Sequence, residues 1–390
     1  MAPSIAIDEL RHEKGQLTVV DPMAGSGTSI VAARLEGHKA IGFDIDPLAV
    51  LIAKTWAANV REDKIRSLAK LTLERANRQL KRISQADSYP DQADEETRKF
   101  VRFWFDPVSR RQLTALRMAI QLSEIGTARD VLWCAFSRMI VTKSEGVSLA
   151  MDVSHSRPHK VYARSPRKPF EQFPLAIERI LQAAPFKDSS RNFPSAKVSH
   201  GDARSLRLPS ASADIVITSP PYLNAIDYLR GHRMALVWMG HQIGALRRIR
   251  SGSIGSENML TGDAAIPASE YLASADLSKG IPSRLQGVLA KYAIDMCAAL
   301  SEIVRVLKPN GRLLLVIGDS TTHGTFISTS GIIRVLADRV GLKLTDMSNR
   351  ALPDNRRYLP PPDSISSKNS LGNRMRSEVI LKFRHTAPKP

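Results

Sequence analysis

Residues 21–28 of the chain are Asp21-Pro22-Met23-Ala24-Gly25-Ser26-Gly27-Thr28, a turn that contains two glycines. The apolar run at residues 17–20 predicts a strand before the turn, and residues 30–35 have the pattern of a helix after it. A strand, a glycine turn and a helix in this order are the setting of a nucleotide-binding turn. Glycine at positions 25 and 27 allows a ligand to approach the backbone where a side chain would block it.

A second stretch ends another predicted strand, Asp214-Ile215-Val216-Ile217, and consists of Thr218-Ser219-Pro220-Pro221-Tyr222. The prolines fix φ and lack N–H donors, so their carbonyl groups point outward as acceptors. Hydrogen bonds from an aromatic amine to the Ser219 hydroxyl and to the Ser219 or Pro220 carbonyl would localise the nitrogen lone pair and activate it as a nucleophile. The Tyr222 ring offers a face on which a flipped base stacks.

Together, the two stretches resemble the DNA amino-methyltransferases of the Class I S-adenosylmethionine-dependent superfamily, which modify cytosine N4 or adenine N6. The resemblance implies S-adenosyl-L-methionine as cofactor, double-stranded DNA as substrate, and Ser219, Pro220, Pro221 and Tyr222 as the catalytic residues. Serine in the first position favours cytosine N4, and adenine N6 is the alternative. Attack on the sulfonium methyl requires proximity and alignment more than a strong base.

The resemblance also implies a cofactor site built from three strand ends. Asp21 is expected to hold the cofactor amino group, Asp44 the ribose hydroxyls, and Asp202 the adenine amine. Asp46 competes with Asp44, although Asp46-Pro47 also suits the start of a helix. The expected cofactor-binding residues are Asp21, Pro22, Ala24, Gly25, Ser26, Gly27, Thr28, Asp44, Ile45, Asp202 and Ala203.

Seven strands are predicted, which places the chain in the α/β class. They span residues 17–21, 39–44, 196–200, 214–218, 311–318, 342–347 and 378–383, with a helix at 292–307 and a turn at 308–311. Apolar strands separated by helices indicate a parallel sheet covered on both faces. No crossover helix separates the last two strands, so the last is expected to insert antiparallel, as in the Class I methyltransferase (Rossmann-like) sheet.

The expected methyltransferase core comprises residues 1–58 and 195–390, interrupted by two insertions. The longer one, residues 59–194, is predicted to be helical over 65–83, 107–124 and 128–142, with a polar, acidic linker at 85–96. It is the candidate DNA- and target-recognition region. The smaller one, residues 240–286, is rich in glycine and serine and is expected to be a loop.

The charge of the chain favours a polyanionic partner, since 56 Lys and Arg against 38 Asp and Glu give +18 over 390 residues. A basic loop between Ser156 and Phe170 lacks acids, and Arg247, Arg248 and Arg250 form a second basic cluster. A merely solvated loop is the alternative. The candidate nucleic-acid-binding residues are Arg157, Lys160, Arg164, Arg167, Lys168, Arg247, Arg248 and Arg250. The aromatic residues Phe100, Phe103, Trp104 and Phe105 are expected to be core.

Several other classes of protein are disfavoured. No run of about 18 apolar residues indicates a transmembrane helix, and the acidic amino terminus is no secretion signal, so a cytoplasmic, nucleoid-associated location in a bacterial or archaeal cell is expected. Cys134 and Cys297 lie in apolar helical patterns and are expected to be buried free thiols. Neither follows proline, which disfavours the covalent chemistry of cytosine C5-methyltransferases. His155 and His159 lack further ligands, so no metal is expected.

Two other functions remain open from the sequence. An RNA or tRNA guanine methyltransferase would share the sheet, and a catalytically inactive DNA-binding relative would share the scaffold. Family members usually carry a cofactor-contacting segment upstream of the glycine turn, whereas twenty residues precede Asp21 here. Either the natural start lies further upstream, or another residue does this work. A companion restriction or defence system is a further expected partner.

Overall fold

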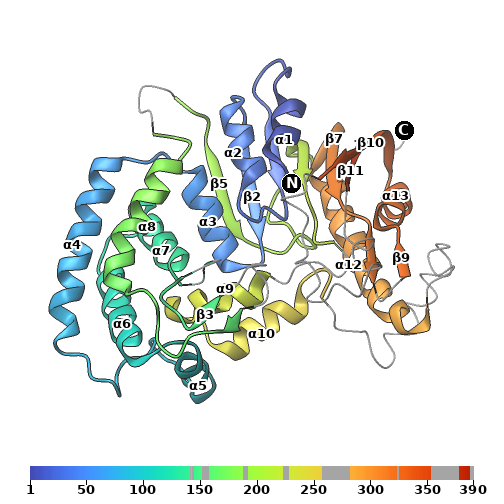
Figure 1. The fold of residues 1–390 in the computed structure, drawn as a ribbon. Helices are drawn as coiled ribbons and strands as arrows, with labels where there is room; N and C mark the ends of the chain where they lie inside the picture. Colours follow the sequence, from blue (N-terminus) through green and yellow to red (C-terminus); the bar gives the residue numbers. More distant parts are fainter. Residues whose placement is uncertain are drawn as a thin grey trace. The chain divides into compact units, whose positions relative to one another are not determined.

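The computed structural model describes residues 1–140, 142, 145–151, 158–187, 192–222, 228–256, 282–322, 325–352 and 377–386. The chain forms two compact units (Figure 1). We call them the sheet unit, made of Met1–Ile45, Phe193–Ala225 and Ser251–Pro390, and the helical unit, made of Asp46–Asn192 and Ile226–Arg250.

The sheet unit is built on seven strands in the order β10-β11-β7-β6-β1-β2-β5. The neighbouring pairs from β7 to β5 are parallel, while β11 lies antiparallel between β7 and β10. All seven predicted strands and the antiparallel insertion of the last are therefore confirmed. The strand bounds are β1 Thr18–Asp21, β2 Lys39–Asp44, β5 Ala196–His200, β6 Ala213–Thr218, β7 Leu307–Ile317, β10 Leu342–Ala351 and β11 Ser377–His385.

The turn predicted at residues 308–311 is instead an irregularity inside β7. Ala213 pairs with Leu307 but Ile215 pairs with Arg312, so β7 has extra residues opposite β6. Asn310 takes up a left-handed conformation there, with φ +64°. The helix before it, α12 (Ser283–Val306), begins earlier than predicted and runs directly into the strand.

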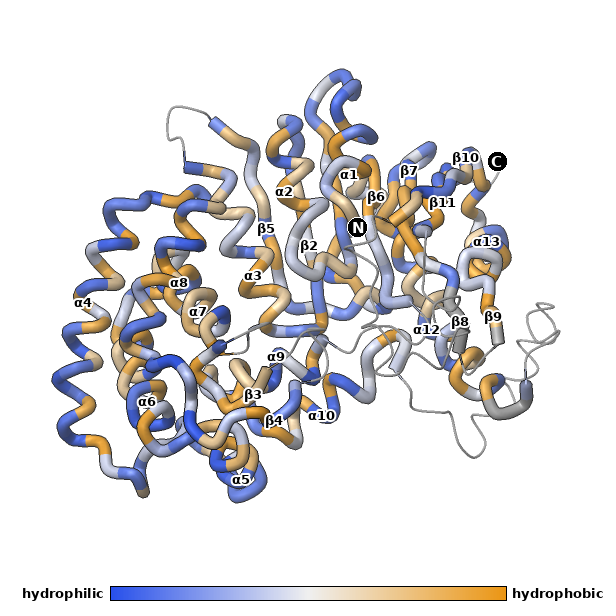
Figure 2. The backbone as a smooth tube through the Cα atoms, viewed as in Figure 1, coloured by the Kyte–Doolittle hydropathy of each residue, from blue (hydrophilic) through white to orange (hydrophobic). Residues whose placement is uncertain are grey.

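Helices cover both faces of this sheet. Leu313 of β7 points into an apolar core that includes residues of α12 and α13 (Thr329–Arg339). Arg312, one residue earlier, pairs instead with Glu9 and Glu13, at and just after the end of α1 (Pro3–Leu10). Because successive side chains of a strand alternate between faces, α1 lies on the face opposite α12 and α13. Helix α2 (Thr28–Leu35) packs next to α1. Strands β6 and β7, between the two helix layers, are apolar along most of their length (Figure 2).

A short hairpin of β8 (Ser320–Thr322) and β9 (Thr325–Ile327) completes the described elements of the sheet unit.

The helical unit contains most of the longer insertion. Its elements are α3 Pro47–Ala57, α4 Glu62–Leu80, α5 Glu95–Trp104, α6 Pro107–Gln121, α7 Thr127–Arg138, α8 Pro169–Ala183, α9 Tyr228–Leu236, η1 Val237–Met239 and most of α10 Ile243–Gly252, with a ribbon of β3 Ala150–Met151 and β4 His159–Lys160. The three predicted helices correspond to α4, α6 and α7. Helices α5, α8, α9 and α10 were not predicted.

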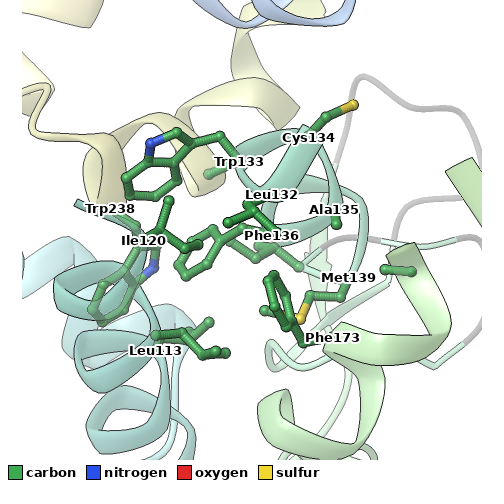
Figure 3. Close-up of a cluster of buried hydrophobic side chains, with 14 of the residues drawn as sticks. Leu113, Ile120, Leu132, Trp133, Cys134, Ala135, Phe136, Met139, Phe173 and Trp238 are labelled. Atoms are coloured by element: carbon green, nitrogen blue, oxygen red, sulfur yellow. The ribbon is translucent and has the colours of Figure 1, made fainter. Parts of the chain in front are cut away.

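The core of the helical unit explains why its bounds differ from the expected domain bounds. Leu113, Phe136 and Phe173 from α6, α7 and α8 meet Trp238 of η1 in one buried cluster (Figure 3). Residues 228–250 therefore pack with the helices, whereas the sequence assigned residues 228–239 to the core and 240–250 to the smaller insertion. Of the rest of that insertion, residues 251–256 and 282–286 are described, and residues 257–281 lie outside the described residues.

The two cysteines differ. Cys134 is buried in this cluster, where burial raises the pKa of its thiol to about 11. Cys297 is only partly buried. Across the part of the chain that the structure describes, no helix is both long and apolar enough to span a membrane.

Candidate cofactor and catalytic site

The glycine turn lies at the carboxyl end of β1 and is fixed to the end of β2. The Ala24 amide donates to the Phe43 carbonyl over 2.8 Å, and the Gly25 amide donates to the Asp44 carboxylate over 2.8 Å. Gly25 and Gly27 have φ values of +52° and +85°, which L side chains rarely adopt. The glycines are thus required by the backbone conformation of the turn.

The space in front of the turn is open. A Cβ atom built on Gly25 would meet no atom within 4 Å. Gly27 precedes α2 without a side-chain cap, so the first amides of this helix are available to an anionic group. The turn therefore has both the room and the donors for the carboxylate end of a small ligand.

Asp44 lies beside the glycine turn, whereas Asp46 takes part in the start of a helix. Asp44 ends β2 beside the glycine turn and is half-buried. Asp46 caps α3 by accepting from the Leu48 amide over 2.9 Å, and it also lies 2.6 Å from Nδ1 of His232. The helix-start interpretation of Asp46 is confirmed. Next to Asp44, the Ile45 carbonyl lies 3.0 Å from Nε2 of His200.

The carboxylate of Asp21 is buried and links the two decisive stretches of sequence. Thr218, the last residue of β6, donates to Asp21 Oδ1 over 2.7 Å, and Ser29 of α2 donates to Oδ2. The Met23 amide adds a bond of 3.0 Å. Burial raises the pKa of the Asp21 carboxyl, and these hydrogen bonds oppose that rise. From the sequence, Asp21 is expected to contact the cofactor. In the structure, Asp21 joins the glycine turn to Thr218, the residue before Ser219.

The Ser219–Tyr222 segment begins where β6 ends, next to β1 in the parallel sheet. Within the described residues, the Ser219 hydroxyl has no hydrogen-bond partner, so it is available as an acceptor. The Tyr222 hydroxyl donates to the buried Glu378 at the start of β11 over 3.2 Å, and Arg350 holds the other Glu378 oxygen at 3.1 Å. This chain of contacts fixes the Tyr222 ring.

Two further residues support the segment from behind. Gly255 (φ +77°) approaches it so closely that a Cβ there would lie 3.3 Å from the Tyr222 carbonyl oxygen and 3.5 Å from Cβ of Pro221. Tyr292 of α12 is fully buried, and within the described residues its hydroxyl has no hydrogen-bond partner. Burial raises the pKa of this phenol, and the nearby Tyr222 phenol adds to the rise.

Asp202 lies after β5 and is engaged by its own neighbour. The Arg204 guanidinium donates to both carboxylate oxygens at 2.6–3.2 Å, and it also reaches Asp295 at 2.6 Å. Burial raises the pKa of the Asp202 carboxyl, but the hydrogen bonds from Arg204 outweigh burial and hold this pKa below its usual range. The adjacent Gly201 amide donates to the Asp44 carbonyl over 3.0 Å, which brings the two acids to the same edge of the sheet.

The sequence missed Glu378, Arg350, Arg204 and the role of Thr218. A signal existed for Glu378, which is the one acid of its strand and directly precedes the apolar run Val379-Ile380-Leu381.

The candidate nucleic-acid-binding residues lie in the helical unit. Lys160 of β4 and Arg164 on the following loop are exposed, whereas Arg167 pairs with Glu145 at 2.6 Å. On α10, Arg247 pairs with Glu96 of α5. Lys168, Arg248 and Arg250 are at least partly exposed, and Arg157 lies outside the described residues.

Comparisons with known proteins found similarity to methyltransferases. The model of the ribosomal protein L11 methyltransferase (PrmA) family matches residues 5–87. Type II methyltransferase M.MvaI of Kocuria varians is 24% identical over 98% of this chain and 89% of its own length. Type II methyltransferase M.BsoBI of Geobacillus stearothermophilus is 21% identical over 86% of this chain and 75% of its own length.

Among solved structures, an S-adenosylmethionine-dependent methyltransferase of Methanosarcina mazei aligns over 100% of this chain and 99% of its own, with 8% identity and a TM-score of 0.35. The strand order itself is decisive, because β5-β2-β1-β6-β7-β11-β10 with only β11 antiparallel is the order of the Class I sheet. The chain has the Class I methyltransferase fold.

Proposed function

We propose that the protein is an S-adenosylmethionine-dependent DNA methyltransferase that modifies the exocyclic amino group of a flipped base, with cytosine N4 favoured. One observation carries the proposal: the Asp21–Thr218 hydrogen bond of 2.7 Å joins the glycine turn to the Ser219–Tyr222 segment across adjacent parallel strands. A cofactor turn and a base-activating segment are thus held beside each other at one edge of the sheet.

The residues of the turn fit S-adenosylmethionine. The open space at Gly25 admits the methionine part, the first amides of α2 suit its carboxylate, and Asp44 suits the ribose hydroxyls. Asp202 and Ala203 are the residues that we propose for the adenine ring, although Arg204 already occupies the Asp202 carboxylate. When bound, the cofactor supplies an electrophilic methyl group on a sulfonium.

The Ser219–Tyr222 segment prepares the amine. The Ser219 hydroxyl and the Ser219 or Pro220 carbonyl accept hydrogen bonds from the amino group, so that the nitrogen lone pair is directed away from the ring. Pro220 and Pro221 lack N–H donors and keep these acceptors rigid. Tyr222, fixed through Glu378, provides the stacking face for the flipped base. The remaining barrier is then lowered by proximity and alignment.

The helical unit supplies the DNA contacts in this proposal. Lys160 at the end of β4 and Arg164 on the loop after it are exposed cations, and the net charge of +18 suits a polyanionic substrate. The curated relatives are named type II methyltransferases, which supports DNA as the substrate and a companion restriction enzyme as a partner.

A methyl-transfer assay with the purified chain and a radiolabelled cofactor tests this proposal. Label should enter double-stranded DNA and not tRNA, and Ser219→Ala should lower turnover with little change in cofactor affinity. Cys134→Ser should keep full turnover, because no covalent intermediate is needed. Label in tRNA with untouched DNA would contradict the proposed substrate, and unchanged turnover in Ser219→Ala would contradict the proposed chemistry.

A further inference from the structure

The four neighbouring aromatic residues at the end of α5 do not all belong to the core. Trp104 and Phe105 are buried, and Phe100 packs partly against the same cluster. The Phe103 side chain, in contrast, is 51% exposed. The expectation that all four form a core cluster is therefore wrong for Phe103, which lies on the outer side of the last helical turn.

A cation and a second apolar side chain lie beside this exposed ring. The Lys160 ammonium is 4.8 Å from the centre of the Phe103 ring, within the range of a cation–π contact. Val161, the next residue, is 53% exposed. The backbone brings them together, since the Leu149 amide donates to the Trp104 carbonyl over 2.8 Å and the Val161 amide donates to the Leu149 carbonyl over 2.9 Å. We call Phe103, Lys160 and Val161 the Phe103 surface.

The loop that follows β4, and begins with Val161, is held in place by hydrogen bonds of Ser165. The Ser165 amide donates to the Asp106 carboxylate over 2.7 Å, and the Ser165 hydroxyl donates to the Val147 carbonyl over 2.8 Å. Asp106 in turn caps α6 through the Ser109 amide. The helix junction that follows Phe103 therefore holds the loop, so the exposed ring and its neighbouring cation keep a defined spacing.

The charge around the Phe103 surface indicates which partner it suits. Lys99, Lys160 and Arg164 are exposed, and residues 158–168 contain no acid. An apolar protein partner would offer Lys160 and Arg164 no counter-charge. A nucleic acid suits both the cations and the exposed ring, because its phosphates neutralise cations and its bases stack on aromatic rings with little sequence preference.

We propose that the Phe103 surface is a DNA-contact site in which the ring stacks on an unpaired base while Lys160 contacts the adjacent phosphate. This rests on the proposed function, because extrusion of a target base leaves unstacked bases in the duplex. Phe103 is thereby a substrate-contacting residue outside the sheet unit.

Binding measurements with the full chain test the proposal, using one duplex in a fully paired form and in a form with a single mismatched pair. Phe103→Ala should weaken binding of the mismatched duplex roughly 5- to 150-fold and leave the slope of log affinity against log salt unchanged. Phe103→Trp should keep the affinity, and its fluorescence should be quenched by DNA. Lys160→Ala should weaken both duplexes at low salt and reduce the slope by about 0.9.

A matched control separates stacking from general loss of apolar surface. Ile125 is 88% exposed in the same unit, and Ile125→Ala should bind both duplexes as wild type does. Unchanged affinity in Phe103→Ala, with methyl transfer to DNA intact in wild type, would overturn the inference alone. If Phe103→Ala self-associates less than wild type and keeps its DNA affinity, the Phe103 surface is a protein interface and the inference is overturned. Wild type that neither binds nor methylates DNA would remove the proposed function as well.

Discussion

Replacement of Thr218 by valine removes the contact that joins the two halves of the site. Valine has nearly the same shape, so the change deletes the hydroxyl without opening a large cavity. The lost bond is 2.7 Å long and ends on a fully buried carboxyl group. Hydrogen bonds to charged groups contribute about 1.5–3 kcal/mol, and we expect a loss of unfolding free energy in this range.

The expected loss can be measured in two ways. For a domain of about 150–250 residues, each kcal/mol shifts the melting temperature by about 2–4 °C, so Thr218→Val should melt about 3–12 °C lower. Because Thr218 directly precedes Ser219, a displaced segment should also lower kcat for methyl transfer by about 10- to 100-fold. Cofactor affinity, measured by calorimetry, should change little.

Ser29 provides the matched control, because its hydroxyl donates to the other oxygen of the same carboxylate. Ser29→Ala should lose similar stability, but it lies on the cofactor side and should keep most of kcat. Thr218→Ser, which retains the donor, should keep kcat as well. Equal losses of kcat in Thr218→Val and Ser29→Ala would refute the argument that Asp21 positions the Ser219–Tyr222 segment.

Three further outcomes are expected. Gly25→Leu would fill the open space in front of the turn, and Asp44→Ala would remove the ribose acceptor. Both substitutions should weaken cofactor binding in calorimetry by at least about tenfold (roughly 1.4 kcal/mol). Unchanged affinity in both variants would refute the cofactor site. Tyr222→Phe should lose the Glu378 bond, about 1.5–3 kcal/mol, but keep the ring. Tyr222→Ala should lose the stacking face and most DNA methylation, and equal activity in the two variants would argue against stacking. Burial raises the pKa of the Asp214 carboxyl, but hydrogen bonds from a lysine and a backbone amide outweigh burial and lower this pKa in the folded chain. The stabilising contribution of Asp214 is therefore present above about pH 4 and is lost as pH falls through the folded pKa. Denaturant titrations of Asp214→Asn and wild type should converge in acid.

The strands were predictable because each is a short apolar run bounded by polar or turn-forming residues. Helix α5 was missed because Asp94-Glu95-Glu96 resembled an acidic linker, although these residues form an N-cap and an acidic first turn. Once the helix is known, the periodicity places Val101 and Trp104 inward and Phe103 outward. Helix α8 was missed because it begins with Pro169 and contains Pro174.

The positions of the motif residues followed from the strand order, because carboxyl ends of adjacent parallel strands share one edge. Their partners did not follow. Glu378 lies 156 residues from Tyr222, and Thr218 lies 197 residues from Asp21, so only the folded sheet reveals these pairs. The position of Asp202 was predictable, but the second carboxylate that binds its partner Arg204, Asp295 of α12, lies 91 residues from Arg204.

Nucleoside mass spectrometry tests the central claim most directly. DNA from a methylation-free host that expresses the wild-type chain should contain N4-methylcytosine, and DNA from hosts that express Ser219→Ala or Tyr222→Ala should contain little or none. N6-methyladenine in place of N4-methylcytosine would keep the mechanism and change the base. Finding 5-methylcytosine, or no methylated base in DNA, would contradict the proposal that the Ser219–Tyr222 segment activates an exocyclic amine.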